Sequence, residues 1–370
     1  SDLGNRGEFM SLLDDARKRI NAIDEEMAKL FEQRMQAVED VIRYKQAHQM
    51  KVLDTSREQY VIEHNTAFIQ REEYRDSYIE FISEMMAISR KYQRSIINRD
   101  LIGYSGTEGA FSHIAAERVF LDHRKKSYAS FEDVFHAVTE REVAYGVIPF
   151  ENSYTGEVGE VLDLLMRYDV YINDIYDLQI SQNLLGVKGA SLADIKQVYS
   201  KDQAIYQSKK FLEGRGYELI PYPNTALAAE YVAKENDKSK AAIAAKENAE
   251  LYGLDILAED INTSEQNTTR FIIISKQLIQ QGNRFSLAFT THHKAGALVH
   301  AMNIIAQYGF NMQSIKSRSI KERPWEYYFY VEIEGNLKDA KEQHLIHDLK
   351  EACEEVKILG AYQNDERKQG

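Results

Sequence analysis

The chain has 370 residues, 44% of them hydrophobic and 28% charged, and its formal net charge is −12 at pH 7. This length is too great for one helical bundle and indicates two or three domains, while the composition is typical of a soluble globular protein. The acidic charge argues against a nucleic-acid partner, and no apolar run approaches the length of a membrane span.

Cysteine usage and the first residues set further limits. The single cysteine, Cys353, excludes an intrachain disulfide and fits a reducing cytoplasm. Nothing at the start resembles a signal peptide, so we expect a cytoplasmic protein. Residues 1–9 show no periodicity and precede Met10, and we interpret them as a leftover of protein expression outside the native domains.

The first long segment predicts a helix with cations on its apolar face. Apolar residues recur every three or four positions from Leu13 to Tyr44, which is typical of an amphipathic helix. Arg34 takes one of these apolar positions, and Lys45 lies only about 20° away around the helix. Both should point into a bundle, where a buried cation needs an anion. Alternatively, Arg34 fixes the helix register and Lys45 extends to solvent.

Arg17 lies elsewhere on the same predicted helix. It precedes Arg34 by seventeen residues, which places it about 100° off that face. Arg17 therefore cannot easily serve the same pocket from the same chain, but it can serve the pocket of a partner.

Two further helices are expected to complete the pocket. The second begins near Asp54 and brings Arg57 and Glu58, although Thr55 to Glu58 also reads as a capping box that would make Glu58 structural. The third spans about residues 77–97 and carries Ser89 and Gln93 side by side at i and i+4. The set offers cations for carboxylates and neutral or acidic groups for hydroxyls.

This set resembles the all-helical chorismate mutases over residues 11–97. The matched residues are Arg17, Arg34, Lys45, Asp54, Arg57, Glu58, Ser89 and Gln93. The resemblance implies an intertwined helical dimer in which Arg17 crosses into the neighbouring site. It also implies that the three arginines grip carboxylates and that Lys45 and Gln93 address the ether oxygen. Asp54 and Glu58 would take the ring hydroxyl or position the cations. The rearrangement needs only positioning and charge stabilisation.

From Leu101 onward, short strands alternate with polar loops and helices, which predicts an α/β architecture. Predicted helices that are preceded by Gly, Ser and Asn offer free backbone N–H groups to anions. Alternatively, these residues only cap the helices. No dinucleotide or Walker motif is present, and His and Cys are too scattered for a metal site. We therefore expect no metal and no organic cofactor.

Three motifs in this region resemble prephenate dehydratases over residues 101–280. They are Gly106 to His113, Glu151 to Gly156, and Thr269-Arg270-Phe271. The resemblance implies two lobes with the substrate in the cleft between them. Thr269 would donate a proton or a hydrogen bond to the departing hydroxyl. Alternatively, it is only a β-branched residue that starts a strand.

The same resemblance assigns the cleft walls. Arg270 would be a carboxylate or structural partner. The expected substrate-binding residues on the walls are Glu151, Asn152, Ser200 and Gln207. The sequence departs from the family in two places: Lys201-Asp202 replaces a common His-Pro, and Gln182 stands where many members have histidine. Both departures change the electrostatics expected in the cleft.

The last eighty residues predict a βαββαβ order, which is ferredoxin-like. This segment resembles the ACT domains that bind amino acids at subunit interfaces. Gly296-Ala297-Leu298-Val299 and Asn311 match positions at which dehydratase ACT domains bind phenylalanine. Lys316-Ser317-Arg318-Ser319 departs from the usual Glu-Ser-Arg-Pro and loses a carboxylate and a rigid proline.

We therefore expect an all-α mutase domain at residues 10–98, a two-lobed α/β dehydratase domain at 101–280, and a ferredoxin-like α+β ACT domain at 284–365. The predicted function is conversion of chorismate to prephenate and then to phenylpyruvate, with phenylalanine as effector, in a homodimer or a dimer of dimers. One alternative is a non-catalytic sensor of aromatic amino acids. The other is retention of only one activity.

Overall fold

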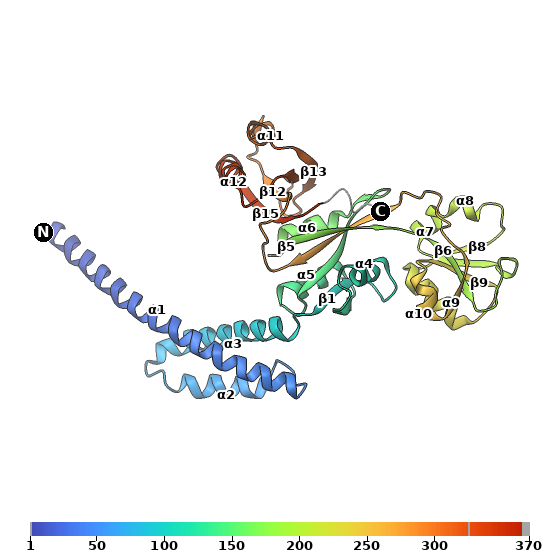
Figure 1. Cartoon of the computed structure of the whole chain (residues 1–370). Helices are drawn as coiled ribbons and strands as arrows, with labels where there is room; N and C mark the ends of the chain where they lie inside the picture. The colour runs from blue at the N-terminus through green and yellow to red at the C-terminus, as the bar shows by residue number, and fades with distance from the viewer. Residues whose placement is uncertain (1, 325, 365–370) are drawn as a thin grey trace. The chain divides into compact units, whose positions relative to one another are not determined.

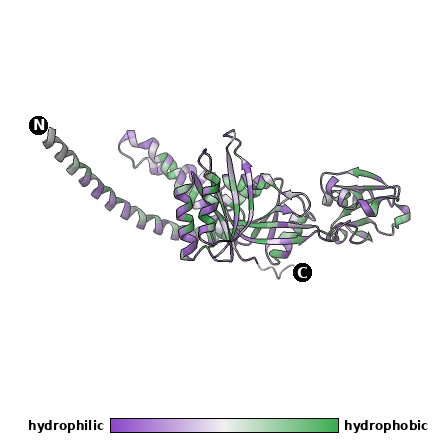
Figure 2. Cartoon of the chain, turned by 90° about the horizontal axis from the view of Figure 1, so that it is seen from above, coloured by the Kyte–Doolittle hydropathy of each residue, from purple (hydrophilic) through white to green (hydrophobic). Residues whose placement is uncertain are grey.

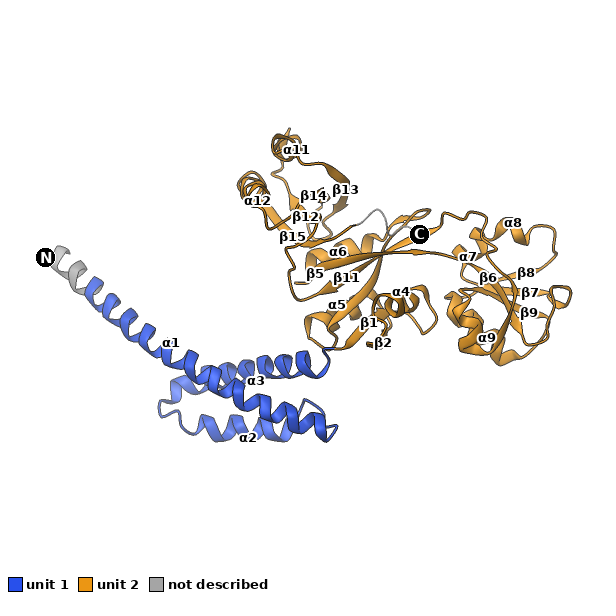
Figure 3. Cartoon of the chain, in the orientation of Figure 1, with its two compact units in different colours: residues 1–99 blue, residues 100–370 orange. Residues whose placement is uncertain are grey.

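A computed structural model describes residues 2–324 and 326–364. The chain divides into two compact units, residues 1–99 and 100–370 (Figure 3). The boundary falls between Arg99 and Asp100, where the all-helical part of the chain ends. Among the described helices, none combines the length and apolar character needed to cross a membrane.

The first unit contains three α-helices and one short 3-10 helix. They are α1 (Asp2–Ala47), α2 (Thr55–Thr66), η1 (Glu72–Tyr74) and α3 (Arg75–Ile97). Helix α3 packs against both α1 and α2, and the buried apolar residues here are Ile42 of α1 and Ile82 and Met86 of α3. Helix α1 begins at Asp2, so residues 2–9 continue its backbone, and their origin as a leftover of expression stays a prediction.

Helix α2 begins differently from the predicted capping box. Its N-cap is Asp54, whose carboxylate accepts from the backbone N–H of Arg57 at 3.0 Å. Thr55 is already the first helical residue. Glu58 is therefore not the second half of a Thr55 box, and its carboxylate is available to a neighbouring helix.

The second unit is built around two sheets, which form two lobes (Figure 1). The large lobe contains β1 (Leu101–Ser105), α4 (Phe111–Val119), β2 (Arg124–Tyr128), α5 (Phe131–Thr139), β3 (Tyr145–Asn152), β4 (Gly156–Glu157), α6 (Gly159–Arg167), β5 (Tyr171–Gln179) and β11 (Thr268–Ser275). Its strands lie in the order β5-β11-β3-β1-β2. Alternate residues of β3 face opposite layers, because Val147 packs on the α4 side and Ile148 on the α5 and α6 side.

The small lobe is inserted between β5 and β11. It contains β6 (Asn183–Val187), η2 (Leu192–Asp194), β7 (Gln197–Ser200), α7 (Asp202–Gln207), α8 (Lys209–Leu212), β8 (Glu218–Pro221), α9 (Thr225–Glu235), β9 (Lys240–Ala244), α10 (Glu247–Tyr252) and β10 (Leu254–Ala258). Its strand order is β10-β6-β9-β7-β8. Ser208 separates α7 from α8. Two chain connections therefore join the lobes, as in a two-lobed binding protein.

The C-terminal segment has a βαββαβ element order and extends the large sheet. Its elements are β12 (Arg284–Thr290), α11 (Ala297–Gln307), β13 (Met312–Ser319), β14 (Tyr327–Glu334), α12 (Ala340–Ala352) and β15 (Glu355–Tyr362). They lie in the order β13-β14-β12-β15, and β15 pairs in parallel with β5 at Gly360 and Ile172. A Cβ at Gly360 would lie 2.1 Å from the carbonyl oxygen of Ile172, so only glycine permits this junction.

Candidate active sites

Polar residues of α1 and α3 meet in the first unit. The Arg34 guanidinium donates through Nη1 to Ser89 Oγ at 2.5 Å, and burial lowers the pKa of Arg34. The Lys45 ammonium donates to the Val52 carbonyl at 2.5 Å and to Gln93 Oε1 at 3.3 Å. Ser89 and Gln93 are themselves buried. The structure thus brings together the two inward cations and the i, i+4 pair expected from the sequence.

The polar residues at the start of α2 make contacts outside the group formed by Arg34 and Lys45. Glu58 pairs with Arg90 of α3, a partner that sequence spacing did not identify. Asp54 is engaged as the helix cap, and Arg57 is exposed with its guanidinium carbon 5.2 Å from the centre of the Tyr60 ring. In this chain, Glu58 therefore braces α2 against α3, while Arg57 is open to an anionic ligand.

Arg17 lies too far along α1 to join this group. A continuous helix rises 1.5 Å per residue, so Arg17 is about 26 Å from Arg34 and about 42 Å from Lys45 along the axis. Its side chain is exposed. Arg17 therefore cannot contribute to the site formed by Arg34 and Lys45 of its own chain.

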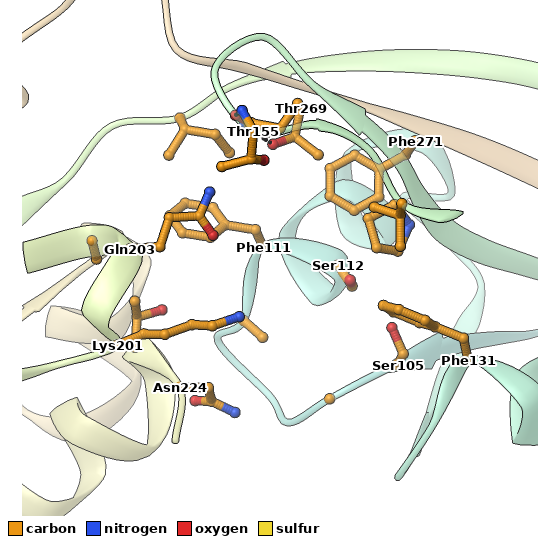
Figure 4. A pocket seen from close by; sticks show the side chains of 18 of the residues that line it. Ser105, Phe111, Ser112, Phe131, Thr155, Lys201, Gln203, Asn224, Thr269 and Phe271 are labelled. Atoms are coloured by element: carbon orange, nitrogen blue, oxygen red, sulfur yellow. Dashed lines mark hydrogen bonds between the residues drawn. The ribbon is translucent and has the colours of Figure 1, made fainter. Parts of the chain in front are cut away.

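The second site is a cleft of about 670 Å³ between the two lobes. From the large lobe, the N-terminal end of α4 and the strands β3 and β11 line it, and from the small lobe Lys201, α7 and the N-terminal end of α9. Figure 4 shows Phe111, Phe131 and Phe271 on the walls and Thr269 at one edge. The N-terminal turns of α4 and α9 present backbone N–H groups, which favour anions. This combination suits an anionic ligand with an unsaturated ring.

Asn152 organises the wall of the cleft around Thr269. Its amide Nδ2 donates to Thr269 Oγ1 at 2.9 Å and to Asn267 Oδ1 at 3.0 Å. Its Oδ1 accepts from the backbone N–H groups of Tyr154 and Thr155 at 2.9 and 3.2 Å. Because Thr269 accepts from Asn152, its own hydroxyl proton is left for a ligand in the cleft.

The charges of the cleft come from few residues. Of the residues that line it, all within the described part of the chain, Lys201 alone is a cation and Glu151 and Glu160 are carboxylates. Lys201 extends from the small lobe into the space opposite Thr269 (Figure 4). Lys201 was noticed in the sequence only as a departure, yet it supplies the charge expected of a carboxylate-binding residue.

Among the neutral residues of the cleft, one position also differs from the family. Gln182, the other departure, donates from Nε2 to Gln207 Oε1 at 3.3 Å, and both line the cleft. The aromatic residues Phe111 and Phe271 stand inside the recognised motifs, so the sequence could have identified them as walls. Phe131 carried no such signal, because it reaches the cleft only through the packing of α5.

Two predicted binding residues do not reach the cleft. Ser200 is 0% exposed, and its hydroxyl donates to the Ile243 carbonyl at 2.7 Å, so it fastens β7 to β9 instead of binding a ligand. Arg270 does not line the cleft, and it donates to both oxygens of Asp177 at 2.8 and 3.0 Å. This hydrogen bonding raises the pKa of Arg270 and favours the structural alternative over substrate binding.

The C-terminal segment has a cavity of about 460 Å³ at the start of α11. The residues Gly296, Ala297, Leu298 and Val299 all line it. Gly296 has a φ of +80°, and no atom lies within 4 Å of the place where a Cβ would stand, so glycine is required by backbone conformation. Asn311 lies outside the lining, and its carbonyl accepts from the Glu334 N–H at 3.0 Å. In a single chain, Asn311 therefore does not contribute to this cavity.

Comparison with known proteins assigns both units. Residues 16–94 match the family "Chorismate mutase type II", and residues 102–278 match "Prephenate dehydratase". A bifunctional chorismate mutase/prephenate dehydratase of Neisseria gonorrhoeae is 32% identical over 95% of this chain and 97% of its own length. The chain thus carries a chorismate mutase domain and a prephenate dehydratase domain. It belongs to the family of bifunctional chorismate mutase/prephenate dehydratases.

Solved structures resemble the second unit. One described as "GqqA- a novel type of quorum quenching acylases" is 26% identical, with a TM-score of 0.68, and covers 73% of this chain and 100% of its own. A prephenate dehydratase from Arthrobacter aurescens in complex with L-Phe has a TM-score of 0.66 at 24% identity, covering 71% of this chain and 90% of its own. Since one fold carries different described activities, the substrate and the roles of residues must be argued from the site.

Proposed function

We propose that this chain converts chorismate to prephenate at the helical site and prephenate to phenylpyruvate, water and carbon dioxide in the interlobe cleft. The observation that carries this proposal is the Thr269 hydroxyl at the cleft wall, which accepts a hydrogen bond from Asn152 and so keeps its own proton for another acceptor. The polar set on α1 and α3 argues against a non-catalytic sensor, because a sensor has no use for two half-buried cations beside neutral partners.

At the helical site, catalysis requires positioning and charge stabilisation. The rearrangement breaks a carbon–oxygen ether bond while a carbon–carbon bond forms, so negative charge develops on the ether oxygen. Lys45 and Gln93 are placed together and would donate to that oxygen. Arg34 and Arg57 would hold the two carboxylates in the compact conformer.

The mutase site would be completed by a second chain. Arg17 lies too far from Arg34 to act within one chain, and the predicted apolar face of α1 is uncovered. Leu13, Ile20, Ile23, Met27 and Leu30 are between 44% and 60% exposed. Figure 2 shows hydrophobic positions recurring along α1. A second α1 laid along this face would bury it and deliver Arg17 to the neighbouring site.

In the cleft, the loss of carbon dioxide supplies the electron pair with which hydroxide leaves. The electron pair of the ring-to-carboxylate bond enters the ring and leaves with the hydroxyl on the opposite ring carbon, so the ring becomes aromatic. The departing oxygen takes a proton, which is replaced from solvent, and becomes water. Thr269 would donate the hydrogen bond that this oxygen needs as it leaves, and Phe111 and Phe131 would face the forming ring.

Lys201 would bind the carboxylate that the product retains. An ion pair to the departing carboxylate would stabilise the ground state and slow its loss, because only interactions stronger in the transition state accelerate a reaction. The cation opposite Thr269 is therefore better matched to the pyruvyl carboxylate. Glu151, Asn152 and Gln207 would contact the remainder of the substrate.

The C-terminal segment would be a ferredoxin-like ACT domain that binds phenylalanine near Gly296. Its βαββαβ order and the cavity lined by Gly296 to Val299 support this assignment. The L-Phe complex named for the Arthrobacter aurescens dehydratase makes phenylalanine the ligand to test. Titration calorimetry with phenylalanine should detect binding, and no binding at millimolar concentration would reduce this segment to a structural role.

One experiment tests the catalytic proposal as a whole. Purified protein is given chorismate, and the ultraviolet signal of chorismate is followed together with the appearance of phenylpyruvate. We expect both signals to change, with prephenate as the intermediate. Loss of chorismate without phenylpyruvate would leave only the mutase, and turnover of supplied prephenate alone would leave only the dehydratase.

A further inference from the structure

One face of strand β13 brings two cations of the C-terminal segment against the large lobe. Residues along β13 alternate between half-buried and exposed, and Lys316 and Arg318 both belong to the half-buried set. Arg318 donates to both oxygens of Asp163 on α6 at 3.2 and 2.7 Å. Lys316, two residues earlier on the same face, reaches the neighbouring strands β3 and β4 instead.

The ammonium of Lys316 lies among acidic and aromatic groups of the large lobe. Its Nζ is 3.3 Å from Glu151 Oε1 and 3.7 Å from Glu157 Oε2, and it lies 5.1 Å from the centre of the Phe150 ring. The Lys316 side chain is only 10% exposed. The ammonium makes no hydrogen bond to the described part of the chain and the Glu151 side chain is 43% exposed, so Lys316 acts on Glu151 through its charge at close range.

Glu151 stands between two cavities. It lines the catalytic cleft, and it also lines a separate cavity of about 300 Å³ between the large lobe and the C-terminal segment. Lys316 and Arg270 line only the second cavity. A local irregularity of β3 helps to place Glu151 here, because the pairing with β11 shifts by one residue at Phe150. The Glu151 carboxylate therefore has room on both sides of the wall.

We propose that Lys316 is a positioning residue of the dehydratase, which holds the Glu151 carboxylate at the back wall of the cleft and offsets its charge for a dianionic substrate. The inference rests on the proposed dehydratase function. Without Lys316, Glu151 loses its nearest cation and faces the cleft, where Glu160 is also a carboxylate. A substrate with two carboxylates would then meet uncompensated negative charge in a partly water-excluded space.

This role makes the C-terminal segment part of the substrate-binding electrostatics. Glu151 is followed directly by Asn152, which donates a hydrogen bond to Thr269. Strand β3 therefore carries both the carboxylate partner of Lys316 and the amide that contacts the proposed catalytic hydroxyl. A glutamate in place of Lys316 would add a third carboxylate beside Glu151 and Glu157. The sign of the charge at position 316 should therefore control how readily an anion enters the cleft.

The test measures steady-state dehydration of supplied prephenate. For Lys316→Met we expect KM to rise on the order of tenfold while kcat changes less than about threefold, since ground-state and transition-state dianion are repelled alike. Lys316→Glu should raise KM further, and Lys316→Arg should stay near wild type. Because the mutase lies in the separate first unit, thermal unfolding of each variant is what reports whether the second unit is folded, and Lys316→Gln repeats the neutral substitution if Lys316→Met is unstable.

Three comparisons distinguish this role from one in which Lys316 only attaches the C-terminal segment to the large lobe. In a Glu151→Gln background, Lys316→Met should no longer raise KM, because the charge to be offset is gone. Arg318→Met removes the other clamp and should not reproduce the KM effect. Lys321→Met is a matched control, since that lysine is exposed and lies 4.0 Å from Asp163.

The contrary results distinguish a failure of the positioning role from a failure of the proposed function. An unchanged KM in Lys316→Met, an equal rise in the Glu151→Gln background, or an equal rise in Arg318→Met would overturn the positioning role. Wild-type protein that fails to dehydrate prephenate would instead remove the proposed function, and this inference with it.

Discussion

The side-chain amide of Asn152 donates a hydrogen bond to the hydroxyl of Thr269, with 2.9 Å between Nδ2 and Oγ1. The two residues are directly paired between β3 and β11, although 117 residues separate them in sequence. Asn152 is only 8% exposed, and its other polar atom accepts from two backbone N–H groups of the following turn. The direction of the Thr269 hydroxyl is therefore imposed by a fully engaged neighbour.

Asn152→Asp tests this direction with almost no change in volume. A carboxylate oxygen accepts but does not donate, so the Thr269 proton would turn toward the new carboxylate and away from the cleft. We expect kcat for prephenate dehydration to fall by about 100-fold, the cost of one lost catalytic donor, with a smaller change in KM. The mutase rate should be unaffected. A near-wild-type kcat would show that the hydroxyl direction does not matter.

The two activities should be separable by single substitutions. Lys45→Ala should lower the mutase rate by about 100-fold or more, since it removes a donor to the ether oxygen, and it should spare dehydration of supplied prephenate. Thr269→Val should do the reverse, because it replaces the hydroxyl with a methyl of similar shape. Thr269→Ser is the matched control and should retain most dehydratase activity. Loss of both activities in one folded variant would contradict the assignment of one site to each unit.

Local patterns predicted the helices and strands well, because they depend on neighbouring residues. The spacing of apolar residues predicted α1, and Asp54 marked the start of α2, although as part of a different cap. The elements of the C-terminal segment follow the expected βαββαβ order. Hydrophobic period and turn residues carry this information directly in the sequence.

Side-chain partners across long separations could not be predicted in the same way. Arg270 was expected to be a carboxylate or a structural partner, and only the placement of Asp177 beside it by β5 distinguishes the two. Ser200 is the last residue of a buried strand, where ligand-binding residues often lie, yet its hydroxyl donates to the neighbouring strand. The meeting of Lys316 with Glu151 depends on the register of β13 against the large lobe, which no single segment determines.

Lys201 should control affinity for prephenate. Lys201→Met removes the only cation among the cleft-lining residues, all of which lie in the described part of the chain, so KM for prephenate should rise by about 10- to 100-fold. The change in kcat should be smaller if Lys201 binds the retained carboxylate. Lys201→Arg should recover much of the affinity. A fall in kcat with unchanged KM would place Lys201 at the departing carboxylate instead.

The mutase site should be rebuilt in mixed dimers. Arg17→Ala and Arg34→Ala chains should each lack mutase activity, because every site loses one arginine. In a mixed dimer, one site receives Arg34 from the first chain and Arg17 from the second, so it is intact. After equal mixing and full exchange, about a quarter of all sites should be wild type. Two different Arg34 variants, Arg34→Ala and Arg34→Met, are the matched control and should show no recovery. Subunit exchange is verified by mass-tagged chains, and exchange without recovered activity would place Arg17 outside the shared site.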